Sequence, residues 1–73
     1  MSMGIERSGV PLTKRELEVL NYITEGKSTE DTAYEMHVSK RTVDFHLANI
    51  YEKLGVSNRV QAYRMARQFG LVE

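Results

Sequence analysis

Two adjacent cations, Lys40 and Arg41, follow Ser39, a residue type that commonly caps the start of a helix. The two earlier caps in the chain are each followed three residues later by an acid, whereas here that place is taken by Thr42 and no acid comes before Asp44. Two cations at the positive end of a helix cost a few tenths of a kcal/mol each, so an external anion is a natural compensation. The pattern indicates a site for phosphate groups; the alternative is that both side chains only extend into solvent.

The same segment has two distinct faces if it is a helix. Val43, Leu47, Ile50 and Leu54 follow the spacing i, i+4, i+7 and i+11 and form one apolar stripe. Phe45 lies off this stripe, and a phenyl ring gains roughly 1.5–3 kcal/mol from burial. Its functional interpretation is contact with a thymine methyl or a sugar edge in a major groove, and the alternative is packing against the preceding helix or a loop. The opposite face carries Arg41, Asp44, Phe45, Ala48 and Glu52.

The other polar residues favour structural roles. The sequence contains no recognisable motif for a nucleophile–base pair or for a glycine-rich phosphate loop, so no catalytic residue is assigned. Two histidines without cysteine argue against a metal site, and His46 is interpreted as a histidine at the edge of the core. Glu16, Glu18 and Arg59 are interpreted as a structural ion-pair set between the first and fourth helices. Core-edge positions are predicted for most of the four tyrosines, Tyr22, Tyr34, Tyr51 and Tyr63.

Four helices are predicted to position these residues. A capping box at 13–16 begins the first helix, and Gly26 fits a left-handed stop at its end. Ser28 caps a short second helix, and His37 is the candidate for positive φ in the steep turn that follows. The third helix runs from about Lys40 to Leu54. The fourth is capped by Asn58 and turns four residues inward: Ala62, Met65, Ala66 and Phe69.

No segment alternates with period two, so the predicted fold class is all-α, a four-helix arrangement without a sheet. The 73 residues suffice for one domain, expected over 12–73 after a flexible lead-in at 1–11. The absence of cysteine excludes a disulfide scaffold and thiolate metal sites, and no apolar run is long enough for a signal peptide or membrane span.

The net charge of zero conceals an asymmetry. Residues 1–36 hold four basic and seven acidic side chains, whereas residues 37–73 hold six basic and three acidic ones. An electropositive half is the footprint of a nucleic-acid binder, and a merely solvated surface is the alternative.

Four stretches of the chain match the pattern of a known family: LTKRELEVL at 12–20, GKS at 26–28, VSKRTVDFHLANI at 38–50 and KLGV at 53–56, followed by Arg59 and Ala62. In register from residue 12 to about 71, they resemble the LuxR-type (GerE/FixJ-like) helix-turn-helix domain of bacterial transcription regulators. The resemblance implies a tetrahelical DNA-binding fold in which the third helix, 39–54, enters the major groove and the fourth often supplies a homodimer contact.

Carried over by position, the resemblance implies three sets of residues. Those facing base edges or the groove wall are Arg41, Asp44, Phe45, Ala48 and Asn49. Those touching DNA phosphates are Ser28, Ser39, Lys40, Thr42 and Lys53. Those in a dimer seam are Tyr63, Ala66 and Arg67. The implied partners are double-stranded DNA, a second copy of the chain and RNA polymerase, in the cytoplasm at the nucleoid, with no cofactor and no membrane.

Three positions depart from the family pattern. Many members have Lys or Arg where this chain has Asp44, and several have another basic residue in place of Ala48. Asp44 cannot donate to guanine; it can accept from a cytosine amino group or repel phosphate. Thr32 replaces a larger aliphatic residue, so looser packing between the second and third helices is expected.

Other function classes are weighed against DNA binding. A protein-interaction module that pairs with a related regulator and inhibits it fits the zero net charge and Asp44 on the groove face. A sigma-factor-like promoter-reading domain would share the first three helices, but the fourth helix after Gly55 argues against it. An enzyme is the least favoured class, because the core is small and no catalytic constellation is present.

Overall fold

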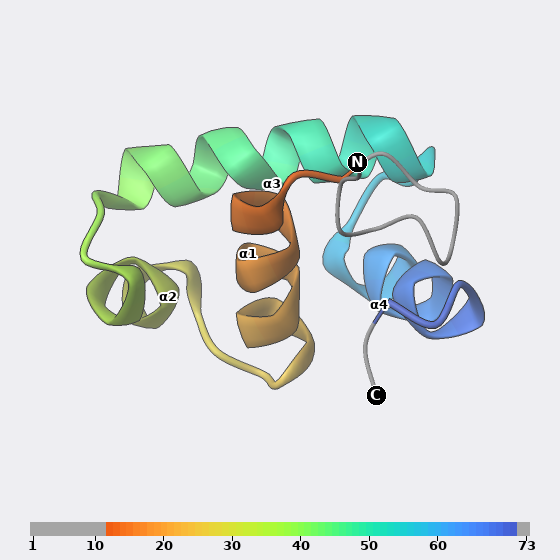
Figure 1. The fold of residues 1–73 in the computed structure, drawn as a ribbon, viewed down its shortest axis with the longest axis horizontal. Coiled ribbons are helices and arrows are strands. Elements are labelled where there is room, and N and C mark those ends of the chain that lie inside the picture. The colour runs from red at the N-terminus through yellow and green to blue at the C-terminus, as the bar shows by residue number, and fades with distance from the viewer. Residues whose placement is uncertain (1–11, 72–73) are drawn as a thin grey trace.

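Four helices without a strand make up residues 12–71, the part of the chain that the computed structural model describes (Figure 1). In chain order they are α1 (Lys14–Thr24), α2 (Thr29–Met36), α3 (Lys40–Leu54) and α4 (Arg59–Gln68). The all-α prediction is confirmed. The predicted lead-in at 1–11 and the last two residues of the predicted domain lie outside the described residues.

Side-chain caps begin all four helices where the sequence predicts them. At α1 the capping box is complete: Thr13 Oγ1 accepts from the Glu16 backbone N–H at 3.1 Å, and Glu16 Oε1 accepts from the Thr13 backbone N–H at 2.9 Å. Ser28, Ser39 and Asn58 each accept from the backbone N–H three residues later. These bonds satisfy donors that have no partner inside the helix.

A left-handed residue sets the turn between α2 and α3. His37 has φ 60° and ψ 42°, the conformation predicted for it. Its backbone N–H still bonds the Tyr34 carbonyl, so α2 is closed by the same residue that redirects the chain. The result is a steep change of direction: Figure 1 shows α2 nearly end on and α3 lengthwise.

The core lies beneath α3, which spans the other three helices in Figure 1. The predicted stripe of α3 is buried, as are Val19, Leu20 and Ile23 of α1. Thr32 is fully buried too, in a place where the family pattern has an aliphatic residue. Its hydroxyl donates to the Ser28 carbonyl at 2.8 Å, so the buried polar atom has a hydrogen-bond partner. The remaining buried apolar residues are Leu12, Ala33, Met36, Ala62 and Ala66.

The predicted ion-pair set between α1 and α4 is wrong. Glu16 pairs with Lys53 of α3 at 2.8 Å, and Glu18 pairs with Arg15 on its own helix at 2.9 Å. Arg59 donates to the Lys27 carbonyl at 3.0 Å instead of to a carboxylate. The reason is geometric: α1 crosses α3, which brings the start of α1 to the last turn of α3.

Two aromatic placements also differ from prediction. Tyr34 is 83% exposed, whereas Tyr22 and Tyr51 do pack at the core edge. Phe69, predicted to be inward, is the C-cap of α4 and is exposed, because the helix ends at Gln68.

Candidate nucleic-acid interface

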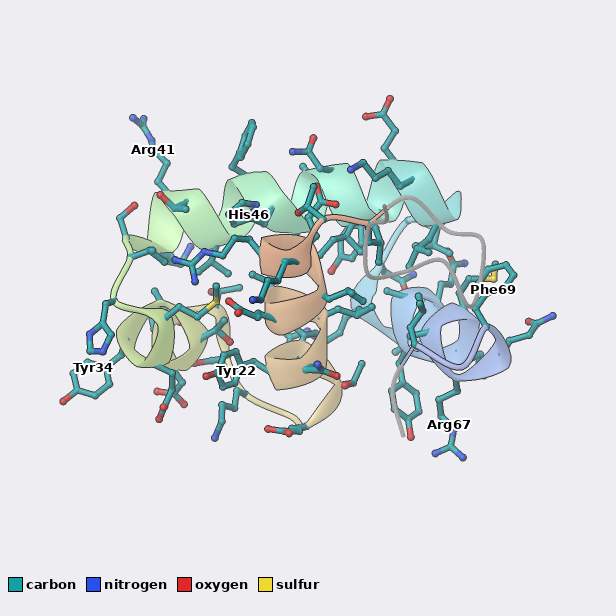
Figure 2. The ribbon with its side chains drawn as sticks, viewed as in Figure 1. Tyr22, Tyr34, Arg41, His46, Arg67 and Phe69 are labelled. Atoms are coloured by element: carbon teal, nitrogen blue, oxygen red, sulfur yellow. The ribbon has the colours of Figure 1, made fainter. Side chains whose placement is uncertain are left out.

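The outer face of α3 is not covered by any of residues 12–71. Arg41, Asp44, Phe45, Ala48 and Glu52 are all exposed, while the stripe on the other side of the helix is buried. Figure 2 shows Arg41 pointing away from the other helices. No carboxylate of residues 12–71 lies within salt-bridge distance of Arg41. Its guanidinium therefore presents a full charge and its donors to whatever approaches this face.

Phe45 is 62% exposed, so the proposed packing against α2 or a loop does not bury it. Its ring centroid lies 5.9 Å from that of His46, at an interplanar angle of 57°. His46 is half-buried beside α1, as predicted for a core-edge histidine (Figure 2). A large apolar side chain held in water on a helix face is available for an apolar contact with a partner.

The hydroxyls at the start of α3 hold the helix terminus together. Ser39 Oγ accepts from the Thr42 backbone N–H at 3.1 Å, and the two side-chain hydroxyl oxygens lie 3.1 Å apart. Both residues sit at the positive end of the helix, where phosphates are favoured.

Lys40 has an anion within the domain, whereas the sequence pattern indicates an external one. Its Nζ lies 3.1 Å from Asp44 Oδ2, one turn further along α3. The hydrogen bond to Asp44 and the charge of that carboxylate raise the pKa of Lys40 above its usual value. Arg41 is thus the cation of this turn that has no intramolecular ion pair among the described residues.

The two remaining phosphate candidates already make contacts inside the domain. Ser28 is half-buried, and its Oγ accepts from the Asp31 backbone N–H at 3.0 Å. Lys53 donates to Glu16 at 2.8 Å, a bond that uses one of its three N–H groups. Lys53 is nevertheless exposed, so its other donors face solvent.

The dimer candidates on α4 divide into two groups. Tyr63 and Arg67 are exposed, and Arg67 Nη1 donates to Tyr63 Oη at 3.0 Å. Ala66 is 0% exposed and belongs to the core, so its side chain cannot touch a partner; the prediction for it is wrong. Ala66 follows Ala62 by four residues and shares its buried side of α4. In Figure 2, Arg67 and Arg41 point to opposite sides of the domain.

Val60 is an exposed residue of α4 that the sequence analysis did not single out. The signal was available, because Val60 falls off the inward spacing of α4. It precedes Tyr63 by three residues, so it adds apolar area beside Tyr63. Phe69, at the end of the helix, is a further exposed apolar residue.

The described residues hold no group of three or more His, Asp or Glu side chains placed to bind a metal ion. None of the helices between residues 12 and 71 has the length and apolar character needed to cross a bilayer.

Comparison with known proteins identifies the family. Residues 10–66 match the GerE family, described as bacterial regulatory proteins of the luxR family. The chain belongs to the luxR family. Among its relatives is the transcriptional regulatory protein LiaR of Bacillus subtilis, which is 46% identical over 61 residues, or 84% of this chain and 29% of LiaR. The HTH-type transcriptional regulator MalT of Vibrio cholerae is 43% identical over 58 residues, or 80% of this chain and 6% of MalT. The luxR-family chain thus spans less than a third of the length of these relatives.

Solved structures agree with the family assignment. The transcription factor GerE matches with a TM-score of 0.80 at 35% identity, over 85% of this chain and 92% of GerE. The response regulator ChrA of a heme-sensing two-component system matches with the same TM-score at 43% identity, over 82% of this chain and 30% of ChrA. The luxR-family chain is thus a helix-turn-helix DNA-binding domain of a bacterial transcriptional regulator.

Proposed function

We propose that this luxR-family domain binds specific double-stranded DNA sequences as a homodimer, with α3 in the major groove. The observation that carries the proposal is the outer face of α3, where Arg41 has no ion-pair partner among residues 12–71 and Phe45 is 62% exposed. An α-helix fits the major groove of B-DNA, where Arg is the commonest reader of guanine and apolar groups meet the thymine methyl.

Contacts to bases and to phosphates have different roles in this proposal. The residues proposed to face bases or the groove wall are Arg41, Asp44, Phe45, Ala48 and Asn49. Those proposed to hold phosphates are Ser28, Ser39, Lys40, Thr42 and Lys53. Phosphate contacts fix the position of α3, and base contacts select the sequence.

Tyr63 and Arg67 are the proposed dimer contacts. They lie on α4 and not on α3, so a second copy can bind there while α3 occupies the groove. Two copies would read half-sites about one helical turn apart, or nearly so. Regulation of transcription at the nucleoid in the cytoplasm, with RNA polymerase as a further partner, follows from this proposal.

A salt titration of DNA binding by fluorescence anisotropy tests the proposal. The logarithm of the binding constant is expected to fall linearly with the logarithm of salt concentration, with a slope of roughly −0.9 per neutralised phosphate. A response independent of salt, or no binding even at low salt, would contradict DNA binding by this face.

Inhibition of a related regulator by heterodimerisation is the second candidate function. It is favoured by the apolar side chains of Val60 and Phe69, which are exposed at α4, and by the neutralisation of Lys40 within the domain. Co-purification with a larger helix-turn-helix regulator, without any shift of DNA by the domain alone, would support this function over direct DNA binding.

A further inference from the structure

Asp44 occupies the middle of the outer face of α3. It follows Arg41 by three residues and precedes Ala48 by four, so the three side chains lie along one side of the helix. Ala48 is short and leaves space next to the carboxylate. Any base edge that lies between the contacts of Arg41 and Ala48 faces Asp44.

Only part of the Asp44 carboxylate is occupied within the domain. Oδ2 accepts from Lys40 Nζ at 3.1 Å, and no residue among 12–71 donates to Oδ1. About half of each side chain is exposed, at 51% for both Lys40 and Asp44. The exposed pair constrains the carboxylate only weakly, and it leaves an acceptor directed to solvent.

Lys40 reduces the electrostatic penalty for bringing a carboxylate close to DNA. An unpaired Asp44 would be repelled by the phosphates on both sides of the groove. The ammonium group at 3.1 Å offsets this charge on the side of the first turn of α3. Lys40 therefore lowers the cost of placing Asp44 near DNA and is also a candidate phosphate contact.

The chemistry of an acceptor-only group restricts which base it can meet. In the major groove guanine presents two acceptors, and thymine presents an acceptor and a methyl group. Adenine presents a donor, but its N7 acceptor lies beside it and repels a carboxylate. Cytosine presents the N4 amino donor with no acceptor of its own next to it.

We propose that Asp44, with its charge partly offset by Lys40, is a specificity-determining residue that selects cytosine in each half-site. The proposal rests on the proposed function, because it requires α3 to lie in the major groove.

Selection of preferred sites from random duplexes, followed by anisotropy titrations, tests this proposal. The wild-type domain is expected to enrich cytosine at one position of each half-site, with a loss on the order of tenfold when that cytosine pair is replaced. Asp44→Ala is expected to lose the preference at this position alone. Asp44→Asn is expected to shift it towards adenine, because Asn bonds both N6 and N7 of adenine.

Glu52→Ala is the matched control, because it removes an equal charge from the same exposed face of α3. Both alanine variants are expected to bind random duplexes more tightly than the wild type, but only Asp44→Ala should change the preferred base. A wild type without cytosine enrichment, or an Asp44→Ala variant that keeps it, overturns the proposal while DNA binding itself stands. Failure of every variant, wild type included, to bind any duplex overturns the proposed function as well.

Discussion

Lys53 Nζ and Glu16 Oε1 lie 2.8 Å apart, which joins the last turn of α3 to the first turn of α1. The same oxygen accepts from the Thr13 backbone N–H, so a single carboxylate both caps α1 and anchors α3. Glu16 is only 4% exposed, whereas Lys53 reaches solvent. The end of α3 is therefore fixed by an ion pair in which the carboxylate is buried and the ammonium group is accessible to solvent.

Replacement of Glu16 by Gln is expected to lower the free energy of unfolding by about 1–3 kcal/mol. Gln keeps the shape and can still cap the helix, so the loss reports the charged bond to Lys53. Urea denaturation followed by circular dichroism measures the change. Glu18→Gln is the control, because the Glu18–Arg15 pair is exposed and a loss within about 0.5 kcal/mol is expected. Equal losses in the two variants would contradict a special role for Glu16.

The free energy of unfolding is expected to fall in acid because Glu16 becomes protonated. Burial by itself raises the pKa of Glu16, but hydrogen bonds from Lys53 and Thr13 and the charges of Lys53 and His46 together bring that pKa below 4.5. A folded-state pKa below the unfolded one means that the stabilisation is present above about 4.5 and is lost as pH falls through the folded value. Urea midpoints measured from about pH 6 to about pH 3 should decline less steeply in Glu16→Gln than in the wild type.

Arg41→Ala is expected to weaken binding to a selected duplex by about 1–3 kcal/mol and to relax the base preference at one position. The reason is that its guanidinium has no ion pair in residues 12–71 and faces outward. Anisotropy titrations with the selected duplex and with single-base variants measure both effects. A uniform loss over all duplexes would instead assign Arg41 to a phosphate.

Lys53→Ala is expected to weaken binding equally across sequences and to reduce the magnitude of the salt slope by about 1. Because Lys53 also holds Glu16, the thermal midpoint must be recorded alongside the titration, and binding is compared well below it. If the titration reveals a sequence-dependent loss, Lys53 does not contact only the backbone of the DNA.

Tyr63→Ala is expected to raise the dissociation constant of the dimer while leaving the free energy of unfolding within about 0.5 kcal/mol of the wild type. Ala66→Leu is expected instead to destabilise the fold, by about 1–3 kcal/mol, because a larger side chain overpacks a fully buried site. Analytical ultracentrifugation and urea denaturation separate the two effects. An unchanged sedimentation profile for Tyr63→Ala would remove Tyr63 from the dimer contact.

Local signals predicted most of the fold. Each helix start carries a side chain that can bond a backbone N–H three residues on, and His37 is one of the few residue types that tolerate positive φ. The stripe of α3 has a regular period and is buried as predicted. These features depend on neighbours in sequence, so the sequence alone sufficed to predict them.

Contacts between distant residues were predicted less well. Glu16 was matched with Arg59, but its partner is Lys53, which depends on where α1 crosses α3. Phe69 was expected inside because the spacing of α4 was extended one residue past its end. The Lys40–Asp44 pair was within reach of sequence reasoning, since its i, i+4 spacing is the ordinary one for oppositely charged neighbours on a helix.

The left-handed turn at His37 also sets the direction in which α3 leaves α2. His37 and Val38 are not helical, whereas the buried stripe from Val43 to Leu54 fixes which side of α3 faces the core. The two residues between α2 and the Ser39 cap therefore act as a short, angled connector, and a change in its geometry would tilt the outward side of α3 relative to α2 without turning the helix about its own axis.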